Sequence, residues 1–388
     1  MEKIEVDVLI YGGGVAGLWL LESLRNKNYS CLLIEKESLG DGQTIVSQGI
    51  IHGGVKYSLP GVFREDSIEE IKGMPERWNQ LLRGESNPNL SNVKISSHDC
   101  YLWISKGLMG KLKSMFAGNG LSILNTKPEK IGRGEAPIWL EESASTIYRV
   151  KEPVIDTTSL LKELSKHNLD RIIYSNQENM NIDFEKDNVK SICFYDLNLK
   201  IYPGTVILTA GKGNKGLAKK MGIEEEIMQE KKLRQILVKN NIPKFYGHCI
   251  DHGVPQMTIT SHSNHNGYIW NVGGRIAEDG DKIDKSLLIK NAREKLIKSL
   301  RGLDFSRSEI YTFDAVKSEM ITKNNERPGS VGIYNKGNVY VGSPTKLALT
   351  PILIERLEER LPRSEIREKP IPNLIKEMKI AKTPWENL

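Results

Sequence analysis

The residues best suited to chemistry near the start of the chain are three glycines, Gly12, Gly14 and Gly17, spaced as G-x-G-x-x-G. They follow an apolar run that predicts a buried parallel strand, and they lead into a run whose spacing predicts a helix. In a dinucleotide-binding turn the first glycine permits a tight bend, the second lets the backbone approach a pyrophosphate, and the third lets helix and strand pack closely. The backbone N–H groups at the helix start, among them those of Val15 and Ala16, are expected to face the phosphates.

An acidic residue completes this unit. A second apolar run, residues 31–34, predicts another parallel strand that ends at Glu35, 18 residues after Gly17. In a strand–helix–strand unit, a carboxylate at this place holds the hydroxyls of a ribose. The alternative is a glycine-rich turn in an ordinary α/β protein with a solvent-facing glutamate. We prefer the nucleotide-binding unit because strand, turn, helix and acid occur together in the expected order.

The segment that follows Glu35 is rich in glycine and differs from an ordinary surface loop. Small residues let a backbone lie flat against a planar ring, and His52 stands here between an apolar pair and two glycines. Histidine can accept a proton near neutral pH. The alternative for His52 is a hydrogen-bonded histidine with a structural role in a turn.

Two later segments repeat the pattern of an apolar strand, a small-residue loop and a helix. The first strand ends at Thr209 and continues through Ala210 and Gly211, although many strand-to-helix turns share this pattern. The second segment covers residues 337–351, where Pro351 suits the first turn of a helix. The three segments together predict a cofactor site assembled from distant parts of the chain.

The stretch from Ser47 to Tyr57, taken with the glycine turn, resembles the flavin-contacting loop of the FAD-dependent D-amino-acid oxidase-like superfamily. It is most similar to the L-2-hydroxyglutarate dehydrogenase and glycerol-3-phosphate dehydrogenase branches, in which an Ile-His-small-Gly core also follows the ribose acid. The resemblance implies FAD as the cofactor and His52 near the isoalloxazine ring. The cofactor-binding residues that it implies are Gly12, Gly14, Val15, Ala16, Gly17, Glu35, Lys36, Gln43, Ser47, Gln48, Gly49, Ala210, Gly211, Gly342, Thr345, Lys346 and Leu347.

The same resemblance implies an α/β fold, in which a Rossmann-like FAD-binding domain of the glutathione-reductase type carries an inserted antiparallel-sheet substrate domain. A chain of 388 residues is also long for a single hydrophobic core. We expect residues 1–85, 150–228 and 310–361 to form the FAD-binding domain. Residues 86–149 and 229–309 are expected to form the substrate domain, and residues 362–388 a tail that packs on the outside or hangs free.

The expected substrate domain contains one preferred anion anchor. Arg275 follows a strand-like run and is expected on the sheet that roofs the flavin, where a guanidinium could bind a carboxylate or phosphate bidentately. A surface arginine is the alternative. Lys56 and Tyr57 are second choices beside His52 and Arg275 in the catalytic group. No metal is expected, because no closed zinc pattern fits the spacing of His248, Cys249, Asp251, His252, His262 and His265.

The composition of the chain limits the classes of partner that we expect. The net charge of +6 is modest, and basic and acidic residues alternate along the chain, so nucleic acid is not expected. The N-terminus lacks the basic region of a signal peptide, and no apolar run is long enough to predict a spanning helix. A peripheral membrane contact is left open. The scattered cysteines suggest neither a zinc site nor a disulfide, so we expect a cytoplasmic protein.

We therefore expect an FAD-dependent oxidoreductase that takes a hydride from a C–H bond beside a hydroxyl or amino group onto flavin N5. The expected substrate is a small, anionic 2-hydroxy acid, amino acid or polyol phosphate, and the electron acceptor is oxygen or a quinone. One alternative is a flavin-dependent tRNA-modifying enzyme, against which the alternating charges argue. The other is a non-catalytic flavin-binding protein.

Overall fold

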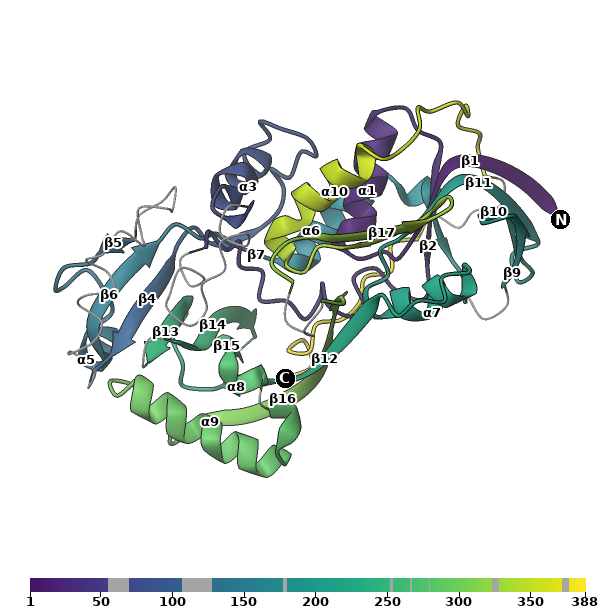
Figure 1. Ribbon diagram of the computed structural model, residues 1–388. Coiled ribbons are helices and arrows are strands. Elements are labelled where there is room, and N and C mark those ends of the chain that lie inside the picture. The colour runs from purple at the N-terminus through teal and green to yellow at the C-terminus, as the bar shows by residue number, and fades with distance from the viewer. Residues whose placement is uncertain are drawn as a thin grey trace.

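The computed structural model in Figure 1 has two parts side by side, each built around a β-sheet. The structure describes residues 1–54, 70–106, 128–176, 180–251, 254–265, 267–278, 280–322, 328–371 and 377–388. The two expected catalytic residues Lys56 and Tyr57, and His252, lie outside these described residues.

The first sheet has the parallel centre that the sequence predicted, and β17, β10 and β9 add antiparallel pairs to it. Its strand order is β17-β18-β11-β1-β2-β8, and β10 and β9 extend it from β11. β1 pairs in parallel with β2 and β11, and β11 pairs in parallel with β18. The strands are β1 (Glu2–Tyr11), β2 (Cys31–Glu35), β8 (Ile172–Tyr174), β9 (Met180–Glu185), β10 (Asn188–Phe194), β11 (Leu199–Leu208), β17 (Gly332–Lys336) and β18 (Val339–Ser343).

Both faces of the central strands are covered, which explains why β1 and β2 are largely apolar. Val8 and Ile10 of β1 face one hydrophobic core, and the alternating Leu9 and Tyr11 face another. The helices α1 (Val15–Asn26), α3 (Met74–Leu82), α6 (Thr157–Ser165) and α10 (Thr350–Glu358) contribute to the first core, and α7 (Asn214–Lys220) contributes to the second.

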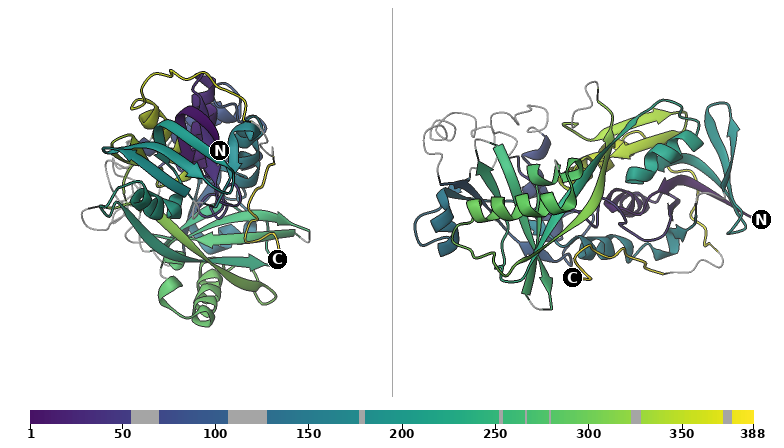
Figure 2. Two further views of the ribbon diagram at one scale, coloured as in Figure 1. Left: turned by 90° about the vertical axis from the view of Figure 1, so that its right-hand side faces the viewer. Right: turned by 90° about the horizontal axis from the view of Figure 1, so that it is seen from below.

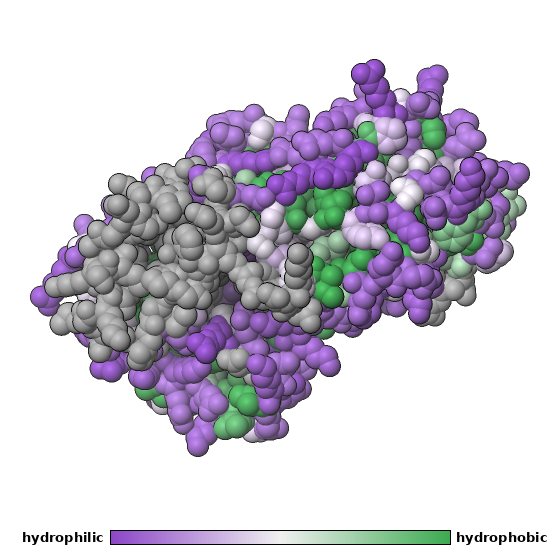
Figure 3. Space-filling model, viewed as in Figure 1, coloured by the Kyte–Doolittle hydropathy of each residue, from purple (hydrophilic) through white to green (hydrophobic). Residues whose placement is uncertain are grey.

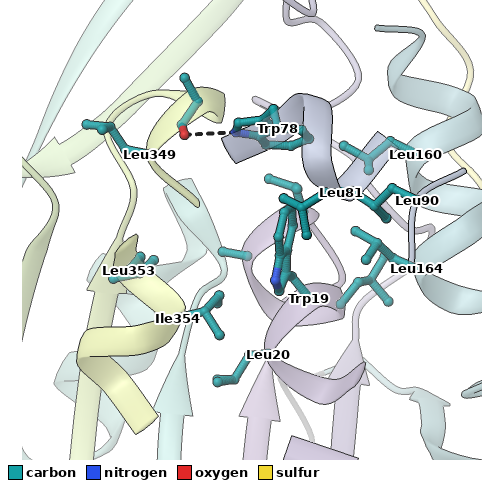
Figure 4. Packing of buried hydrophobic residues seen from close by; sticks show 14 of the residues in the cluster. Trp19, Leu20, Trp78, Leu81, Leu90, Leu160, Leu164, Leu349, Leu353 and Ile354 are labelled. Atoms are coloured by element: carbon teal, nitrogen blue, oxygen red, sulfur yellow. Dashed lines mark hydrogen bonds between the residues drawn. The ribbon is translucent and has the colours of Figure 1, made fainter. Parts of the chain in front are cut away.

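Two tryptophans lie at the centre of the helical core (Figure 4). The rings of Trp19 on α1 and Trp78 on α3 meet edge to face, with centroids 5.1 Å apart. The indole Nε1 of Trp78 donates to the carbonyl of Ala348, at a distance of 3.0 Å. Because this indole is buried, the bond satisfies its only donor and fixes α3 against the start of α10.

The second sheet is mostly antiparallel, with the order β16-β12-β15-β14-β13-β4-β6-β5. One of its faces packs against α9 (Lys285–Ser299) through Leu288, Ala292 and Leu296 (Figure 2). The strands are β4 (Cys100–Ser105), β5 (Glu129–Lys130), β6 (Ala144–Val150), β12 (Met228–Lys239), β13 (Gly247–Asp251), β14 (Val254–Asn264), β15 (Gly267–Gly273) and β16 (Glu309–Met320).

Several short elements lie between these strands and helices. β3 (Ile95–Ser97) and β7 (Val154–Ile155) form a small antiparallel pair. Among the described residues, the other helical segments are α5 (Ile138–Ser143), α8 (Arg275–Glu278), η3 (Leu169–Arg171), η5 (Gly211–Gly213), η6 (Gly280–Lys282) and η7 (Leu347–Leu349).

The strand pairing moves one expected domain boundary. We expected the FAD-binding domain to resume at residue 310, but β16 pairs with β12 along its whole length, from Glu309 opposite Lys239 to Met320 opposite Met228. The second sheet therefore continues to Met320.

On the face seen in Figure 3, the coloured surface is largely hydrophilic, with some apolar spots, one of them over α9. Leu287 and Ile297 of α9 are exposed, and the helix also contains several lysines. Among the residues described, no helix combines the length and the apolar character that a membrane span requires.

The end of the chain packs against both parts of the molecule. Ile380 forms a parallel bridge with Leu39, in the segment that follows β2. Farther on, the Trp385 side chain is only 8% exposed, and its ring stacks on His262 with centroids 3.7 Å apart. Trp385 also packs in a cluster with two residues of the second sheet, Leu237 and Ile269. Residues 377–388 thus connect the two sheets.

We expect Trp385→Ala to lower the free energy of unfolding by roughly 3 kcal/mol, because it removes a buried indole and leaves a cavity between the tail and the second sheet. Chemical denaturation would measure this change. Tyr195→Ala is the control, since that ring is 61% exposed. Equal, small effects of the two substitutions would contradict the proposed contribution of the tail.

Candidate active site and cofactor cradle

The parallel pairing of the first sheet brings the three predicted cofactor segments to one edge. β1, β2, β11 and β18 run in the same direction and end at Tyr11, Glu35, Leu208 and Ser343. The loops that follow these strands therefore lie along the carboxyl edge of the sheet, which is where open α/β sheets bind ligands.

The glycine turn has the close packing that its sequence predicts. Gly12 has a φ of +102°, a conformation that favours glycine. A Cβ on Gly17 would lie 1.9 Å from the carbonyl oxygen of Gly12, and a Cβ on Gly12 would lie 2.5 Å from the Cα of Ala210. These contacts leave no room for side chains where β1 meets α1 and β11.

The start of α1 is built to face a negative group. Gly14, which has no side chain, is the N-cap, and the first turn of the helix contains no acidic residue. The amide of Val15 donates to Thr44 Oγ1 at 3.2 Å. The positive end of the helix dipole therefore lies at the turn without a compensating carboxylate in that turn.

Glu35 lies against the same turn. Its carboxylate accepts hydrogen bonds from the amides of Gly13 at 2.5 Å and Lys36 at 2.7 Å. Burial raises the pKa of Glu35, although these backbone bonds oppose the rise. The position agrees with the ribose contact predicted from the sequence, which remains a prediction.

The segment after Glu35 leads from the cradle edge to the second sheet. Gln43 Oε1 accepts from the amide of Ser318 at 2.7 Å, and a Cβ on Gly211 would lie 3.8 Å from the same oxygen. Gln48 donates to the carbonyls of Thr258 and Asn271, both at 2.9 Å. Two predicted residues, Gln43 and Gln48, thus connect this loop to the second sheet.

Two neighbouring residues fix the end of the same loop. The Ser47 hydroxyl accepts from the amide of Gly49 at 3.2 Å. Gly49 has a φ of +70°, and a Cβ there would lie 2.1 Å from the carbonyl oxygen of Ile155. The backbone therefore turns tightly just before His52.

The other two predicted segments differ in how they reach the edge. Ala210 and Gly211 lead directly from β11 into η5, next to Gly12. Gly342 lies inside β18, where a Cβ would contact the leucines of α10, so its small size serves helix packing. Beyond it, Thr345 is buried with a φ of +55°, and Lys346 and Leu347 are half-buried.

Several buried polar atoms on the second sheet indicate that a ligand belongs here. Both amide atoms of Asn271, Oε1 of Gln235 and Oγ of Ser318 have no hydrogen-bond partner among the described residues. Leaving such an atom unpaired costs about 1–3 kcal/mol, so each one calls for a partner. A Cβ on Gly273 would lie 2.9 Å from Gln48 Oε1 and 3.5 Å from Gln235 Oε1, so these groups share the face next to the loop.

These observations fit FAD. The tight glycine turn and a helix start without an acidic residue suit a pyrophosphate, and the carboxylate beside the turn suits a ribose. The unpaired amides on the facing sheet suit a polar ring or a substrate beside it. The residues that would hold the nucleotide end are Gly12, Gly14, Val15, Ala16, Gly17 and Glu35.

A buried polar cluster joins His52 to the second sheet. His52 Nδ1 and His248 Nε2 each lie 3.2 Å from the same carboxylate oxygen, Oε2 of Glu152. The other oxygen, Oε1, accepts from the amide of Gly53 at 2.7 Å. The side chains of Glu152 and His248 are each 2% exposed, and that of His52 is 15% exposed.

The electrostatics of this cluster favour an ionised glutamate. Burial alone would raise the pKa of Glu152, but the hydrogen bonds from His248 and His52 outweigh it and hold the pKa well below its usual range. The ligand atoms of the three residues lie within 4.8 Å of one another, so the cluster could also offer ligands to a metal.

The remaining predicted polar residues lie elsewhere. β15 ends at Gly273, and Arg275 is exposed at the start of α8 instead of lying on the sheet as we expected. The reason is local: Gly274 adopts a φ of +94° and ends the strand. His262 stacks on Trp385, and burial lowers its pKa to about 3; His265 is exposed.

The sequence did not predict Glu152 as a site residue, and it did not predict the hydrogen bond between Glu152 and His248. One signal was available in the sequence: Glu152 directly precedes the apolar run Pro153–Ile155. A glutamate next to such a run is expected to be buried, and a buried glutamate needs a partner. Asn271 and Gln235 stand in strand-like runs at positions that alternate with buried apolar residues, and only the pairing of β12 with β15 places them on one face.

Comparisons with known proteins agree with this geometry. The family profile described as "DAO: FAD dependent oxidoreductase" matches residues 7–102. The probable FAD-dependent oxidoreductase PA4991 of Pseudomonas aeruginosa is 34% identical over 372 residues, which cover 94% of this chain and 93% of that protein. A mitochondrial glycerol-3-phosphate dehydrogenase of Arabidopsis thaliana matches over 100 residues, 25% of this chain and 16% of its own length, at 29% identity.

Solved structures give the same result. The crystal structure of PA4991 matches with a TM-score of 0.82 and 30% identity, covering 99% of this chain and 98% of that one. Glycine oxidase from Geobacillus kaustophilus has the same fold, with a TM-score of 0.65, 13% identity, and coverage of 94% of this chain and 97% of that one.

We expect Gly17→Ala to lower the free energy of unfolding by about 1–3 kcal/mol, because the new methyl group would collide with the Gly12 carbonyl. FAD affinity should fall with it, since the turn must open. Denaturant unfolding and a fluorescence titration with FAD would measure both. Gly216→Ala in α7 is the control, because a Cβ there meets nothing within 4 Å. If both variants behave alike, the close packing at Gly17 is not important.

The Glu152 pKa predicts a pH dependence of stability. A carboxyl group whose pKa is lower in the folded than in the unfolded state contributes full stability above its unfolded pKa, and this is lost as the pH falls. We expect Glu152→Gln to cost roughly 3 kcal/mol at neutral pH. The gap to the wild-type protein should narrow below about pH 5.

Chemical denaturation over this pH range would test that expectation. Glu2→Gln is the control, because Glu2 is exposed at the start of β1. A gap for Glu152→Gln that does not change with pH would contradict an ionised, buried Glu152.

Proposed function

This chain belongs to the DAO family of FAD-dependent oxidoreductases, and we propose that it oxidises a C–H bond beside a hydroxyl or amino group of a small molecule. The proposed substrates are 2-hydroxy acids, amino acids and polyol phosphates. When bound, FAD supplies the redox chemistry, as it accepts a hydride and with it two electrons.

His52 is the proposed proton acceptor for the substrate hydroxyl or amino group. Its position supports this role, because its backbone continues the loop that follows the cradle, and its side chain retains 15% exposure in an otherwise buried cluster. Its Nδ1 lies 3.2 Å from Glu152 Oε2. The cluster of His52, Glu152 and His248, in which His52 is the most exposed member, is the single observation that carries the proposal.

The unpaired amides supply the proposed orientation of the substrate. Asn271 and Gln235 offer hydrogen-bond donors and acceptors on the sheet face next to Gln48. Buried polar groups that pair only with the correct ligand give strong discrimination, because an analogue that lacks the matching group leaves them unpaired. Arg275 is exposed at the start of α8, after the end of β15.

The electron acceptor is proposed to be oxygen or a quinone. The similar proteins include an oxidase and a dehydrogenase by name, so both kinds of acceptor belong in the test. Measuring reoxidation of the reduced enzyme with oxygen and with a soluble quinone would distinguish them.

A substrate panel tests the proposed reaction. The purified protein should be yellow, and its flavin should bleach anaerobically with one class among 2-hydroxy acids, amino acids and polyol phosphates. Amino acids belong in the panel because glycine oxidase and the L-amino acid deaminase of Proteus vulgaris share the fold. A flavin that binds but responds to none of these classes would refute the proposed substrates.

His52→Gln should slow the bleaching by roughly 100-fold or more, because general-base catalysis contributes at that level. Stopped-flow absorbance under anaerobic conditions measures this step directly. His265→Gln is the control, since that histidine is exposed in the turn that follows β14. An unchanged rate in His52→Gln would show that His52 is not the base.

A further inference from the structure

The residues near Gly273 on the second sheet form a group of carboxamides. Val272 packs in the core that α9 covers, so its neighbours Asn271 and Gly273 face the opposite side of the sheet. A Cβ on Gly273 would lie 2.9 Å from Gln48 Oε1 and 3.5 Å from Gln235 Oε1, so two carboxamide oxygens converge on one point. We call Gln48, Gln235 and Asn271 the carboxamide cluster.

The hydrogen bonds of Gln48 determine which of its amide atoms is the oxygen. Its Nε2 donates to the main-chain carbonyls of Thr258 and Asn271, both at 2.9 Å. A carbonyl oxygen only accepts hydrogen bonds, so the atom that faces these two carbonyls must be the NH₂ group. The other atom, Oε1, is therefore an acceptor, and it lies beside Gly273.

The other two members of the cluster contribute atoms without a partner. Among the described residues, Gln235 Oε1 and both amide atoms of Asn271 are buried and form no hydrogen bond. Asn271 is 0% exposed, so water does not reach it from the surface either. Whichever way its amide is turned, Asn271 offers one acceptor and one donor group. The cluster as a whole presents more acceptors than donors.

This balance of acceptors and donors selects a chemical group. Ionised carboxylates and phosphates present acceptor oxygens, so they would leave the carboxamide oxygens unpaired and place like partial charges next to them. A protonated amino group donates but does not accept, so it would leave the NH₂ group of Asn271 unpaired. A hydroxyl both donates and accepts, and it therefore matches the cluster best.

Gly273 leaves the space that such a group requires. This glycine is not among the residues with a positive φ, so the backbone conformation does not demand glycine here. A glycine inside a strand often marks a place where another group approaches the backbone closely. At Gly273 those groups are the ends of Gln48 and Gln235, and a methyl group would fill the point where their oxygens converge.

The carboxamide cluster lies in the same row of the sheet as part of the histidine cluster. Thr258 is opposite Gly273 in the β14–β15 pair and opposite His248 in the β13–β14 pair. Its hydroxyl lies 3.0 Å from His248 Nδ1, and His248 in turn contacts Glu152. The row from His248 to Gly273 covers two strand spacings, roughly 10 Å. A substrate that reacts beside His52 can therefore extend along this row.

We propose that the carboxamide cluster is a hydroxyl-binding subsite, and that the substrate carries a hydroxyl group in addition to the hydroxyl or amino group that is oxidised. This inference rests on the proposed function. The additional hydroxyl donates to a carboxamide oxygen and accepts from the NH₂ group of Asn271. Within the proposed classes, the subsite selects the hydroxylated members, such as glycerate among 2-hydroxy acids, serine among amino acids and glycerol 3-phosphate among polyol phosphates.

Pairs of compounds that differ by one hydroxyl test the subsite. The pairs are glycerate and lactate, serine and alanine, and glycerol 3-phosphate and propane-1,2-diol 1-phosphate, each in both enantiomers. Anaerobic bleaching of the FAD-loaded protein gives kcat/KM of flavin reduction for each compound. In the class that reacts, we expect the hydroxylated member to be preferred by roughly 10- to 100-fold, because its partner leaves buried carboxamide atoms unpaired.

Asn271→Leu should remove this preference. Leucine has a similar size but forms no hydrogen bond, so kcat/KM of the hydroxylated compound should fall by roughly 10- to 100-fold. The compound that lacks the hydroxyl should change little, so the ratio within the pair should approach one. A loss of packing alone would lower both values together. Asn181→Leu is the control, because Asn181 is exposed on β9, and its ratio should equal that of the wild-type protein.

Gly273→Ala covers the case in which Asn271→Leu does not fold. This variant keeps every polar group of the cluster and adds one methyl group between the oxygens of Gln48 and Gln235. It should therefore lower the preference for the hydroxylated compound at least 5-fold while FAD remains bound. A titration of the protein with FAD, followed by flavin fluorescence, measures cofactor binding separately.

Three results would overturn the inference. They are equal kcat/KM values within the reacting pair for the wild-type protein, an unchanged ratio in folded Asn271→Leu, and a loss of FAD affinity in this variant that accounts for its slower bleaching. The last result would assign Asn271 to the flavin.

A flavin that no compound bleaches would refute the proposed function instead. The subsite would then be tested by thermal unfolding of the FAD-loaded protein with each compound. A hydroxylated compound should raise Tm in the wild-type protein more than its partner does, and this difference should disappear in Asn271→Leu. Equal shifts within every pair would refute the subsite as well.

Discussion

The parallel pairing of β1 with β2 on one side and β11 on the other is the constraint on which the rest of the structure depends. It sends the ends of strands from three distant segments to one edge of the sheet, and β18 joins them through β11. The contacts around Gly12 and Gly17 are possible only because these strands end side by side. The loop that leaves β2 then continues from this edge to the second sheet, so the same pairing also determines where His52 lies.

Local sequence patterns were enough for the cradle. The apolar run before Gly12, the glycine spacing and Glu35 at the end of β2 are all features within 35 residues, and each has a physical reason that a single sequence reveals. The α/β class and the presence of a second sheet followed from the same kind of signal and from the family resemblance. The strand pattern alone does not determine which of the predicted residues contact the cofactor.

The polar cluster could not be predicted in this way, because its members are neighbours only in space. Glu152 is 100 residues from His52 and 96 from His248, and neither separation corresponds to any motif. Arg275 was misplaced for a different reason. The strand-like sequence pattern continues through Arg275, but the strand ends at Gly273 because Gly274 adopts a positive φ. The packing of Trp385 against the second sheet could not be predicted either, because the proline-rich composition of the tail does not indicate which distant residues it contacts.

The position of β1 in the middle of its sheet also has a consequence for how the protein folds. One side of this strand can pair as soon as β2 has been synthesised, but the other side pairs with β11, where Val8 lies opposite Thr205. A newly made chain therefore carries an incomplete sheet with an open apolar edge while most of both domains is still to come. Long-range pairing of this kind slows folding and exposes surfaces that aggregate. Expression at low temperature or with chaperones should accordingly favour the native protein over inclusion bodies.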